Sequence, residues 1–186
     1  GAGPPRQSEP LNFELVANLE LGWDPIVRGG PMNSHAVAVL STFFLLREIG
    51  GAAANINHLT FNKKELLLSL SLPASKTDYI ARGCTRAWGC ICPQPERSTK
   101  ICPYHVALEH VDLVGDWYRR QHANHAEFMK ECWDGEEAPF DDEDIPLFPG
   151  ADGKVVSSEA MVELVDEIAK RSGEQIVNAQ GVRRFG

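Results

Sequence analysis

The chain of 186 residues is 43% hydrophobic and 24% charged, which fits one globular domain with at most an appended arm. It has no run of eighteen apolar residues and no signal-peptide pattern, so we expect an intracellular protein with reduced cysteines and no membrane span. The net charge of −8 gives no support for nucleic-acid binding. However, residues 131–144 hold eight acids and no Lys or Arg, and the other 18 acids balance 18 basic residues, so a DNA-facing surface elsewhere is not excluded.

The first 29 residues are expected to form an N-terminal lead-in arm, and residues 30–186 the domain. Within the arm, residues 12–20 could form a short helix. Because the first residue is not Met, we expect a processed or excised chain.

The clearest predicted helix begins near residue 33 and is apolar on almost every side, which is typical of a helix buried at a domain centre. Asn33 or Ser34 is suited to cap its start, and the Gly50-Gly51 pair is expected to stop it. Residues 52–61 then predict a short helix or a turn that leads to a strand.

Residues 65–72 predict a strand, 73–78 a turn and 78–83 a return strand, which together make a β-hairpin. A Cys-rich loop follows, and then a helix from Pro103 to about His122.

The acidic segment 131–144 is expected to be a loop, and 144–153 a short strand and turn. Ser157 or Ser158 caps a last predicted helix that ends near Gly173 and is followed by a loop. Its expected core stripe is Met161, Val162, Leu164, Val165 and Ile168. The predicted fold class is mainly α with a small β-hairpin or sheet (α+β).

Three of the five cysteines and one histidine fall within sixteen residues. The pattern is Cys90-x-Cys92, then nine residues, then Cys102-x-x-His105 at the entry to a helix. Thiolates and imidazole are the ligands that zinc prefers in tetrahedral structural sites, so the sequence predicts a structural zinc site within a zinc-knuckle-like insertion at 84–105. Cys84 is an alternative ligand and His110 a weaker one. Reduced thiols without metal and disulfides remain alternatives, and no motif of a catalytic metal is present.

Two basic residues are candidate functional residues because of their positions in the predicted elements. Arg47 is expected near the end of the buried helix, in LLREI, and Lys76 in the hairpin turn, in SKTD. From the residues alone, a salt bridge or a solvated helix end would account for Arg47, and a solvated turn for Lys76.

The order of LLREI, SKTD, WGCIC, CPYH, IPLFP and GVRRFG over residues 30–186 resembles the catalytic domain of tyrosine recombinases, the phage-integrase family, in a divergent branch derived from mobile elements. The resemblance implies a partial recombinase catalytic core for DNA recombination and integration. In it Arg47 would clamp the scissile phosphate, and Lys76 would be a general acid or a minor-groove contact.

The same resemblance implies a truncated, catalytically incomplete domain. The family has an acid three residues after the Arg, where this chain has Gly50. The printed sequence stops before the His-x-x-Arg and nucleophilic Tyr elements, and Tyr79, Tyr104 and Tyr118 match no nucleophile position. The resemblance also implies that the partner is DNA, and a DNA-acting protein of this kind would be expected in the nucleus.

Two other functions stay open. The chain could be a domesticated, zinc-stabilised module that contacts a protein partner through the acidic loop with Trp117, Trp133 and Phe140, although such aromatics also serve in cores. The run 141–144, DDED, could bind Mg²⁺ in a nuclease, although consecutive acids in a loop are usually solvated. The sequence predicts no oligomeric state.

Overall fold

A computed structural model describes residues 16–17, 24–46, 54–72, 83–94, 98–121 and 145–180. Its elements in chain order are α2 (Ser34–Phe44), the 3₁₀ helix η1 (Ile56–His58), β1 (Leu59–Asn62), β2 (Leu67–Leu72), β3 (Cys84–Gly89), α4 (Pro103–Gln121) and α6 (Ser158–Gln180). The described residues thus combine three α-helices with one three-stranded antiparallel sheet, which confirms the predicted α+β class.

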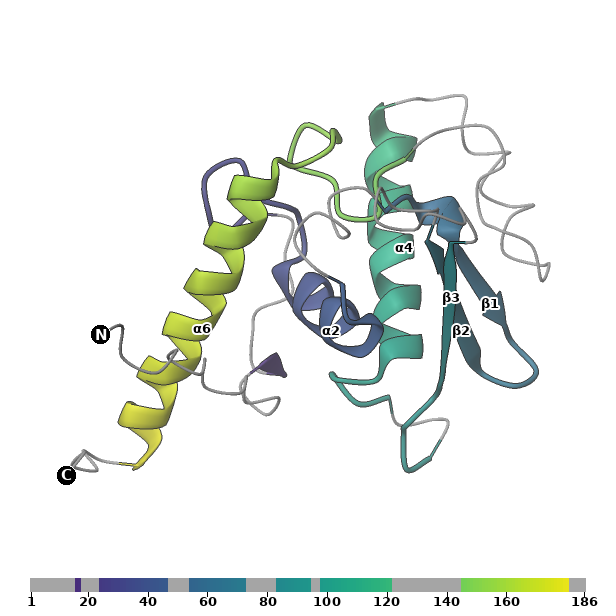
Figure 1. The fold of residues 1–186 in the computed structure, drawn as a ribbon, viewed down its shortest axis with the longest axis horizontal. Coiled ribbons are helices and arrows are strands. Elements are labelled where there is room, and N and C mark those ends of the chain that lie inside the picture. The colour runs from purple at the N-terminus through teal and green to yellow at the C-terminus, as the bar shows by residue number, and fades with distance from the viewer. Residues whose placement is uncertain are drawn as a thin grey trace, which may run out of the picture.

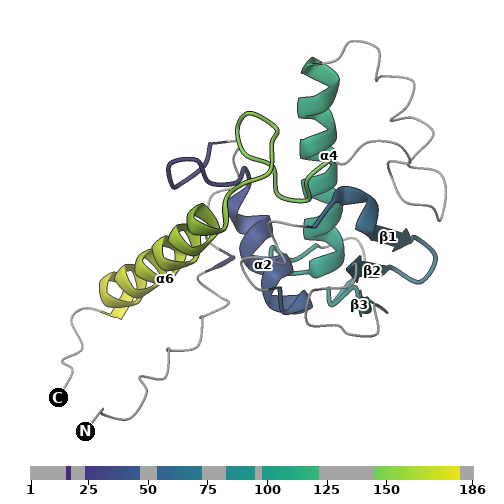
Figure 2. The ribbon, with the colours of Figure 1, turned by 45° about the horizontal axis from the view of Figure 1, so that its top comes forward.

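The elements form successive layers, which Figure 1 shows from α6 through α2 and α4 to the sheet. The turned view in Figure 2 keeps the same order, with α4 between α2 and the sheet. α4 packs on α2 with one side and on β2 and β3 with another, and α2 also touches α6. The core therefore lies on both sides of α4, where Val111, Val114 and Ala107 are fully buried.

The sheet has the order β1-β2-β3, and its inner face is lined by leucines and Phe61. The strand predicted at 65–72 is confirmed by β2, but the prediction of a loop over the first part of the Cys-rich stretch is wrong because Cys84–Gly89 is β3. In β3, Trp88 pairs with Leu68 and Arg86 with Leu70, so long side chains cover the two buried leucines. Residues 78–82, predicted as the return strand, lie outside the described residues.

The short helix predicted within 52–61 is confirmed by η1, and β1 follows it directly. Residues 145–150 do not form the predicted strand. They make isolated bridges instead, with Pro146 opposite Asn55 and Gly150 opposite Pro31. Proline lacks the N–H that a continuous ladder needs, which explains why the pairing is interrupted here.

The N-terminal end of α2 is as predicted, because the Asn33 side chain accepts a hydrogen bond from the Ala36 N–H at 3.2 Å. The prediction that this helix runs to Gly50-Gly51 is wrong. It ends at Phe44, and Leu45 takes a left-handed conformation (φ 51°). Groups from β3 bind the last carbonyls of the helix, and these contacts are described below.

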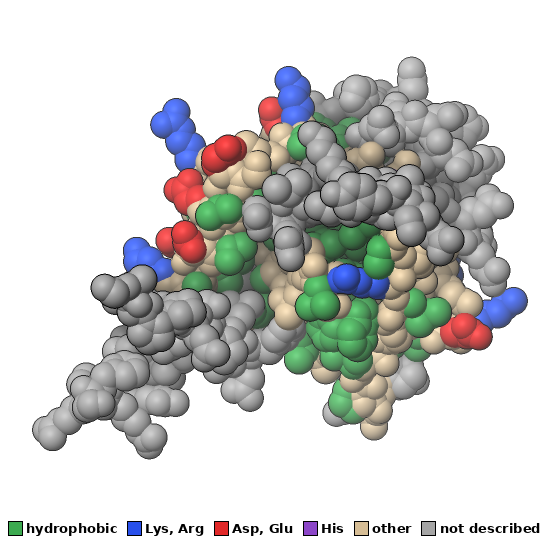
Figure 3. Space-filling view, in the orientation of Figure 1, with side chains coloured by type: hydrophobic (Ala, Val, Ile, Leu, Met, Phe, Trp, Pro, Cys, Tyr) green, Lys and Arg blue, Asp and Glu red, His purple; other side chains and the backbone are tan. Residues whose placement is uncertain are grey.

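The start of α6 is also confirmed, since the Ser157 Oγ accepts from the Ala160 N–H at 3.2 Å. Only part of its predicted stripe is correct: Met161, Leu164 and Ile168 are buried, whereas Val162 and Val165 are 45% and 54% exposed. Figure 3 shows apolar side chains among acidic and basic ones on the side of the molecule where Figure 1 places α6. The helix also continues past Gly173 to Gln180, because one glycine costs only about 1 kcal/mol inside a helix.

Several predicted features lie outside the described residues. They are Arg47, Lys76, most of the N-terminal arm, and the acidic segment 131–144 with Trp133 and Phe140. Among the helices that are described, none combines the length and the apolar character that crossing a bilayer requires.

Candidate metal centre

The two halves of the Cys/His motif are brought together by the end of β3 and the start of α4. Beyond β3, the Cys90 N–H donates to the Leu66 carbonyl at 2.8 Å, which anchors the first half to the sheet. The Cys102 carbonyl accepts from the Val106 N–H at 2.9 Å, so Cys102 stands at the first turn of α4. His105 follows on the same turn, as the Cys-x-x-His spacing predicted.

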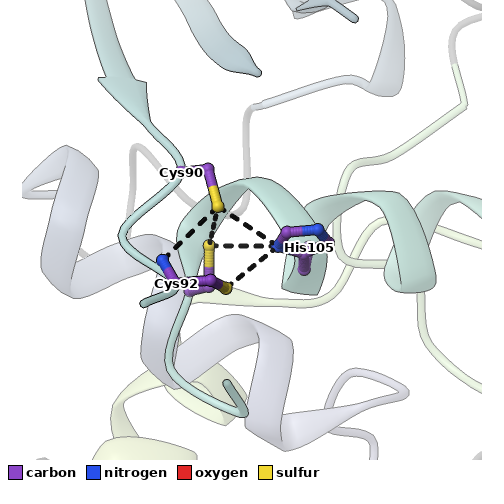
Figure 4. Close-up of side chains that lie close together, drawn as sticks. Cys90, Cys92 and His105 are labelled. Carbon is purple, nitrogen blue, oxygen red and sulfur yellow. Dashed lines mark hydrogen bonds between the residues drawn. The ribbon is translucent and has the colours of Figure 1, made fainter. Parts of the chain in front are cut away.

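The side chains of Cys90, Cys92, Cys102 and His105 converge on one point, and their ligand atoms all lie within 4.8 Å of one another. The Nδ1 of His105 lies 3.6 Å from the Cys90 Sγ and 3.3 Å from both the Cys92 and Cys102 Sγ atoms. Figure 4 shows the imidazole of His105 turned toward the cysteine sulfurs. These four residues lie close enough together to hold one metal ion.

Backbone N–H groups point at two of the sulfurs. The Cys92 N–H donates to the Cys90 Sγ at 3.4 Å, and the Thr99 N–H donates to the Cys92 Sγ at 3.3 Å. Hydrogen bonds of this kind favour the thiolate form, which is the form that binds metals.

The thiols also influence one another's protonation. Burial, together with the neighbouring sulfurs of Cys92 and Cys102, raises the pKa of the Cys90 thiol to about 11, and the Cys92 N–H opposes this rise. Burial raises the pKa of Cys92 too, but the Thr99 N–H and the neighbouring thiols outweigh it and hold that pKa below its usual value. Adjacent thiolates repel, so a cation among them would be needed for all three to ionise together.

The alternatives to this ligand set are not supported. The four cysteines that the structure describes are free thiols, and Cys84 is exposed at the start of β3, outside the cluster. The proposed weaker ligand His110 is buried elsewhere. Its Nδ1 lies 3.3 Å from the Asn33 Nδ2, and its Nε2 lies 2.6 Å from the Leu147 carbonyl oxygen.

Trp117, predicted as a candidate for protein contact, is half-buried and packs against the turn at Gly153. A Cβ at Gly153 would lie 2.3 Å from its ring, so the two are in close contact. The adjacent Tyr118 hydroxyl donates to the Gly153 carbonyl at 2.7 Å.

Two residues that the sequence did not single out meet the end of α2. The Trp88 Nε1 donates to the Phe43 carbonyl at 2.7 Å, and the Arg86 guanidinium donates to the Phe44 carbonyl. Arg47 follows Phe44 by three residues, and Lys76 lies between β2 and β3 in the sequence; both stand outside the described residues. Only the alternation of Arg86 and Trp88 along a strand could have indicated this contact beforehand.

Comparison with family models, with curated proteins and with solved structures found no match for this chain.

Proposed function

We propose that Cys90, Cys92, Cys102 and His105 bind a structural zinc ion. The observation that carries this proposal is the convergence of three sulfurs and the His105 Nδ1, which all lie within 4.8 Å of one another, with four of their pairs 3.3–3.7 Å apart. In a tetrahedron, Zn–S bonds of about 2.3 Å and Zn–N bonds of about 2.0 Å give S···S distances of roughly 3.8 Å and S···N distances of roughly 3.5 Å, close to these values. Four protein ligands leave no open position for substrate, so the role is structural.

The ion would cross-link β3 to α4. Cys90 and Cys92 follow the edge strand of the sheet, and Cys102 and His105 begin the helix on which that sheet packs. A link of this kind removes conformational freedom from the unfolded chain and fixes the exit of β3.

Metal analysis of purified protein tests the zinc proposal. One zinc per chain is expected, with loss of the metal in Cys102→Ser. The matched control is Cys84→Ser, because Cys84 is a free, exposed thiol outside the cluster, and this variant should retain its zinc. Metal-free parent protein, or equal loss from both variants, would refute the proposal.

We further propose that this zinc-braced domain binds DNA in the manner of a tyrosine recombinase. Its support is the order of elements: α2 precedes Arg47, and an antiparallel β2–β3 pair flanks the connection that contains Lys76. An arginine after a buried helix and a lysine in the next hairpin are the phosphate-contacting elements that the resemblance implies. The chemistry would be neutralisation of a DNA phosphate by the two cations.

Titration with a short DNA duplex at several salt concentrations tests DNA binding by the zinc-loaded chain. Affinity is expected to fall as salt rises, and Arg47→Ala and Lys76→Ala should each make the log–log slope shallower by about one. Lys64→Ala is the control, because Lys64 is an exposed cation in the β1–β2 turn, away from both positions in sequence. No binding at low salt would overturn the proposal and favour the alternative, a module that contacts a protein partner.

A further inference from the structure

The three sulfurs of the metal centre differ in their exposure to solvent. Cys102 is fully buried, whereas Cys90 and Cys92 are half-buried. A small oxidant dissolved in water can therefore reach Cys90 or Cys92 before it reaches Cys102. Zinc keeps its cysteine ligands as thiolates, and the thiolate is the form of cysteine that peroxides oxidise. In the zinc-loaded chain, the half-buried sulfurs are thus the accessible targets of a peroxide.

Cys90 and Cys102 are already neighbours within the cluster. Their Sγ atoms lie 3.7 Å apart, which is van der Waals contact for two sulfur atoms. Cys92 is held by Thr99, whose backbone nitrogen lies 3.3 Å and whose hydroxyl oxygen lies 3.9 Å from the Cys92 Sγ. Cys90 and Cys102 are therefore a pair of thiols placed to bond to each other, with one accessible member and one buried member.

A disulfide between these two cysteines would join the same two elements as the ion. The Cys90 N–H donates to the Leu66 carbonyl at 2.8 Å, which ties Cys90 to the sheet, and Cys102 stands at the first turn of α4. The two links exclude each other, however. A disulfide removes two of the four ligands and leaves only Cys92 and His105, too few to retain zinc.

The packing of β3 does not depend on which of these links is closed. The Trp88 Nε1 donates to the Phe43 carbonyl at 2.7 Å, and the two rings make an edge-to-face contact with centroids 5.2 Å apart. The Arg86 guanidinium donates to the Phe44 carbonyl. None of these contacts involves a metal ligand, so β3 should stay on α2 when the ion leaves.

We propose that Cys90 and Cys102 form a peroxide-reactive site, at which oxidation replaces the zinc link between β3 and α4 by a disulfide and releases the ion. This inference rests on the proposed zinc site and adds a chemical regulation to it. The fold is kept in both states, and what changes is whether the centre holds its metal.

The reaction balances with hydrogen peroxide as the oxidant. The Cys90 thiolate attacks one peroxide oxygen, so that an S–O bond forms, the O–O bond breaks and hydroxide leaves, giving a sulfenic acid. The Cys102 thiolate then attacks this sulfur, so that the S–S bond forms, the S–O bond breaks and a second hydroxide leaves. Two electrons pass from the two sulfurs to the peroxide, and zinc departs as Zn²⁺.

Hydrogen peroxide added to the zinc-loaded chain tests the proposal. The double variant Cys84→Ser/Cys132→Ser is used throughout, because it leaves the cluster cysteines as the only thiols. Zinc should be lost to a colorimetric chelator, peptide mapping should find the Cys90–Cys102 disulfide, and dithiothreitol should restore zinc binding. Circular dichroism should be the same before and after oxidation. Zinc loss without this disulfide, or with a different cysteine pair, would overturn the proposal.

Two further substitutions separate the reactive pair from the third thiol. Cys90→His and Cys92→His each keep four zinc ligands, because imidazole also binds zinc. Cys92→His retains the reactive pair and should lose its zinc as the parent does. Cys90→His lacks the pair and should keep its zinc at a peroxide concentration that empties the parent. Equal loss of zinc from both variants would contradict the assignment, and the peptide map of the parent decides the matter if either variant binds no zinc.

The same samples distinguish failure of this inference from failure of the zinc proposal. Parent protein that contains no zinc before peroxide is added would refute the proposed zinc site, and the inference with it. Parent protein that contains zinc and retains it until Cys90 is oxidised to the sulfinic acid would overturn the inference alone.

Discussion

At the scale of single residues, His110 is a fully buried side chain with a polar partner at each ring nitrogen. Its Nε2 must carry the proton, because its partner at 2.6 Å is the Leu147 carbonyl, which can only accept. Its Nδ1 then accepts from the Asn33 amide, whose Oδ1 caps α2. One neutral imidazole thus joins α4 to the start of α2 and to the 145–150 segment.

This arrangement predicts a loss of stability in acid. Burial lowers the pKa of His110 from 6.5 to about 4, with the Leu147 carbonyl opposing the shift. Between these values the unfolded chain binds the proton and the folded chain does not, so the free energy of unfolding falls as the pH drops below about 6.5. The full effect of this group is about 3 kcal/mol at pH values near 4.

Urea unfolding of the parent and His110→Gln at several pH values measures the effect. The variant should be less stable near neutral pH, and the gap should narrow as the pH falls. Comparing the two proteins at each pH cancels the contributions of other groups, including His35, whose pKa burial also lowers. A gap that stays constant with pH would contradict the assignment.

A second prediction at this scale concerns two glycines with positive φ. Gly153 (φ 75°) touches the Trp117 ring, whereas a methyl group placed on Gly29 (φ 69°) would have nothing within 4 Å. Gly29→Ala should cost about 1 kcal/mol from backbone strain alone. Gly153→Ala should cost about 2–4 kcal/mol, because the methyl group also collides with the indole. Chemical denaturation of both variants checks this; equal losses would contradict the Trp117 contact.

At the scale of elements, the orientation of α6 is decided by its neighbour α2. The buried positions 161, 164 and 168 follow helical spacing toward α2, and the valines beside them point away. An apolar side chain in a helix is therefore not in itself a sign of burial. The predicted buried stripe of α6 was too wide because all five apolar residues were assigned to one side of the helix.

Adjacent residues on α6 test this orientation. Leu164→Ala removes a fully buried side chain and should cost about 2–5 kcal/mol, whereas Val165→Ala, at a position 54% exposed, should change stability by less than about 0.5 kcal/mol. Thermal unfolding of the two variants gives the comparison. Similar losses for both would mean that Val165 is covered in solution.

At the scale of the whole molecule, α4 connects the sheet, α2 and the turn before α6. The metal ligands hold its first turn to β3, His110 holds its middle to α2, and Trp117 and Tyr118 hold its later turns to the Gly153 turn. Apolar side chains pack in the space between these contacts. Since the inner leucines of the sheet stay buried against the core, the fold should outlast the metal.

Removal of zinc by a chelator should therefore lower the melting temperature without abolishing cooperative unfolding. If the link is worth about as much as a disulfide, the shift is about 10 °C for a chain of this size. Cys102→Ser should no longer respond to the chelator, while Cys84→Ser should respond as the parent does. An unchanged melting temperature of the parent would show that the site does not brace the fold.

Local signals made the metal ligands, the caps and most helix positions predictable. The four metal ligands lie within the sixteen residues from Cys90 to His105, and the first turn of α4 places Cys102 and His105 side by side. Asn33 and Ser157 cap the helices that they precede within one turn. In each case the interacting groups are close together in the sequence, so a local sequence pattern is enough to predict the interaction.

The sequence by itself determined the α+β class, the Cys₃His cluster and the starts of α2, α4 and α6. Only the tertiary structure decided where α2 ends, that 84–89 is a strand, which side of α6 is buried and what His110 does. The physical reason is distance along the chain. Trp88 lies 45 residues from Phe43, and His110 lies 77 residues from Asn33, so these hydrogen bonds exist only after the elements pack together.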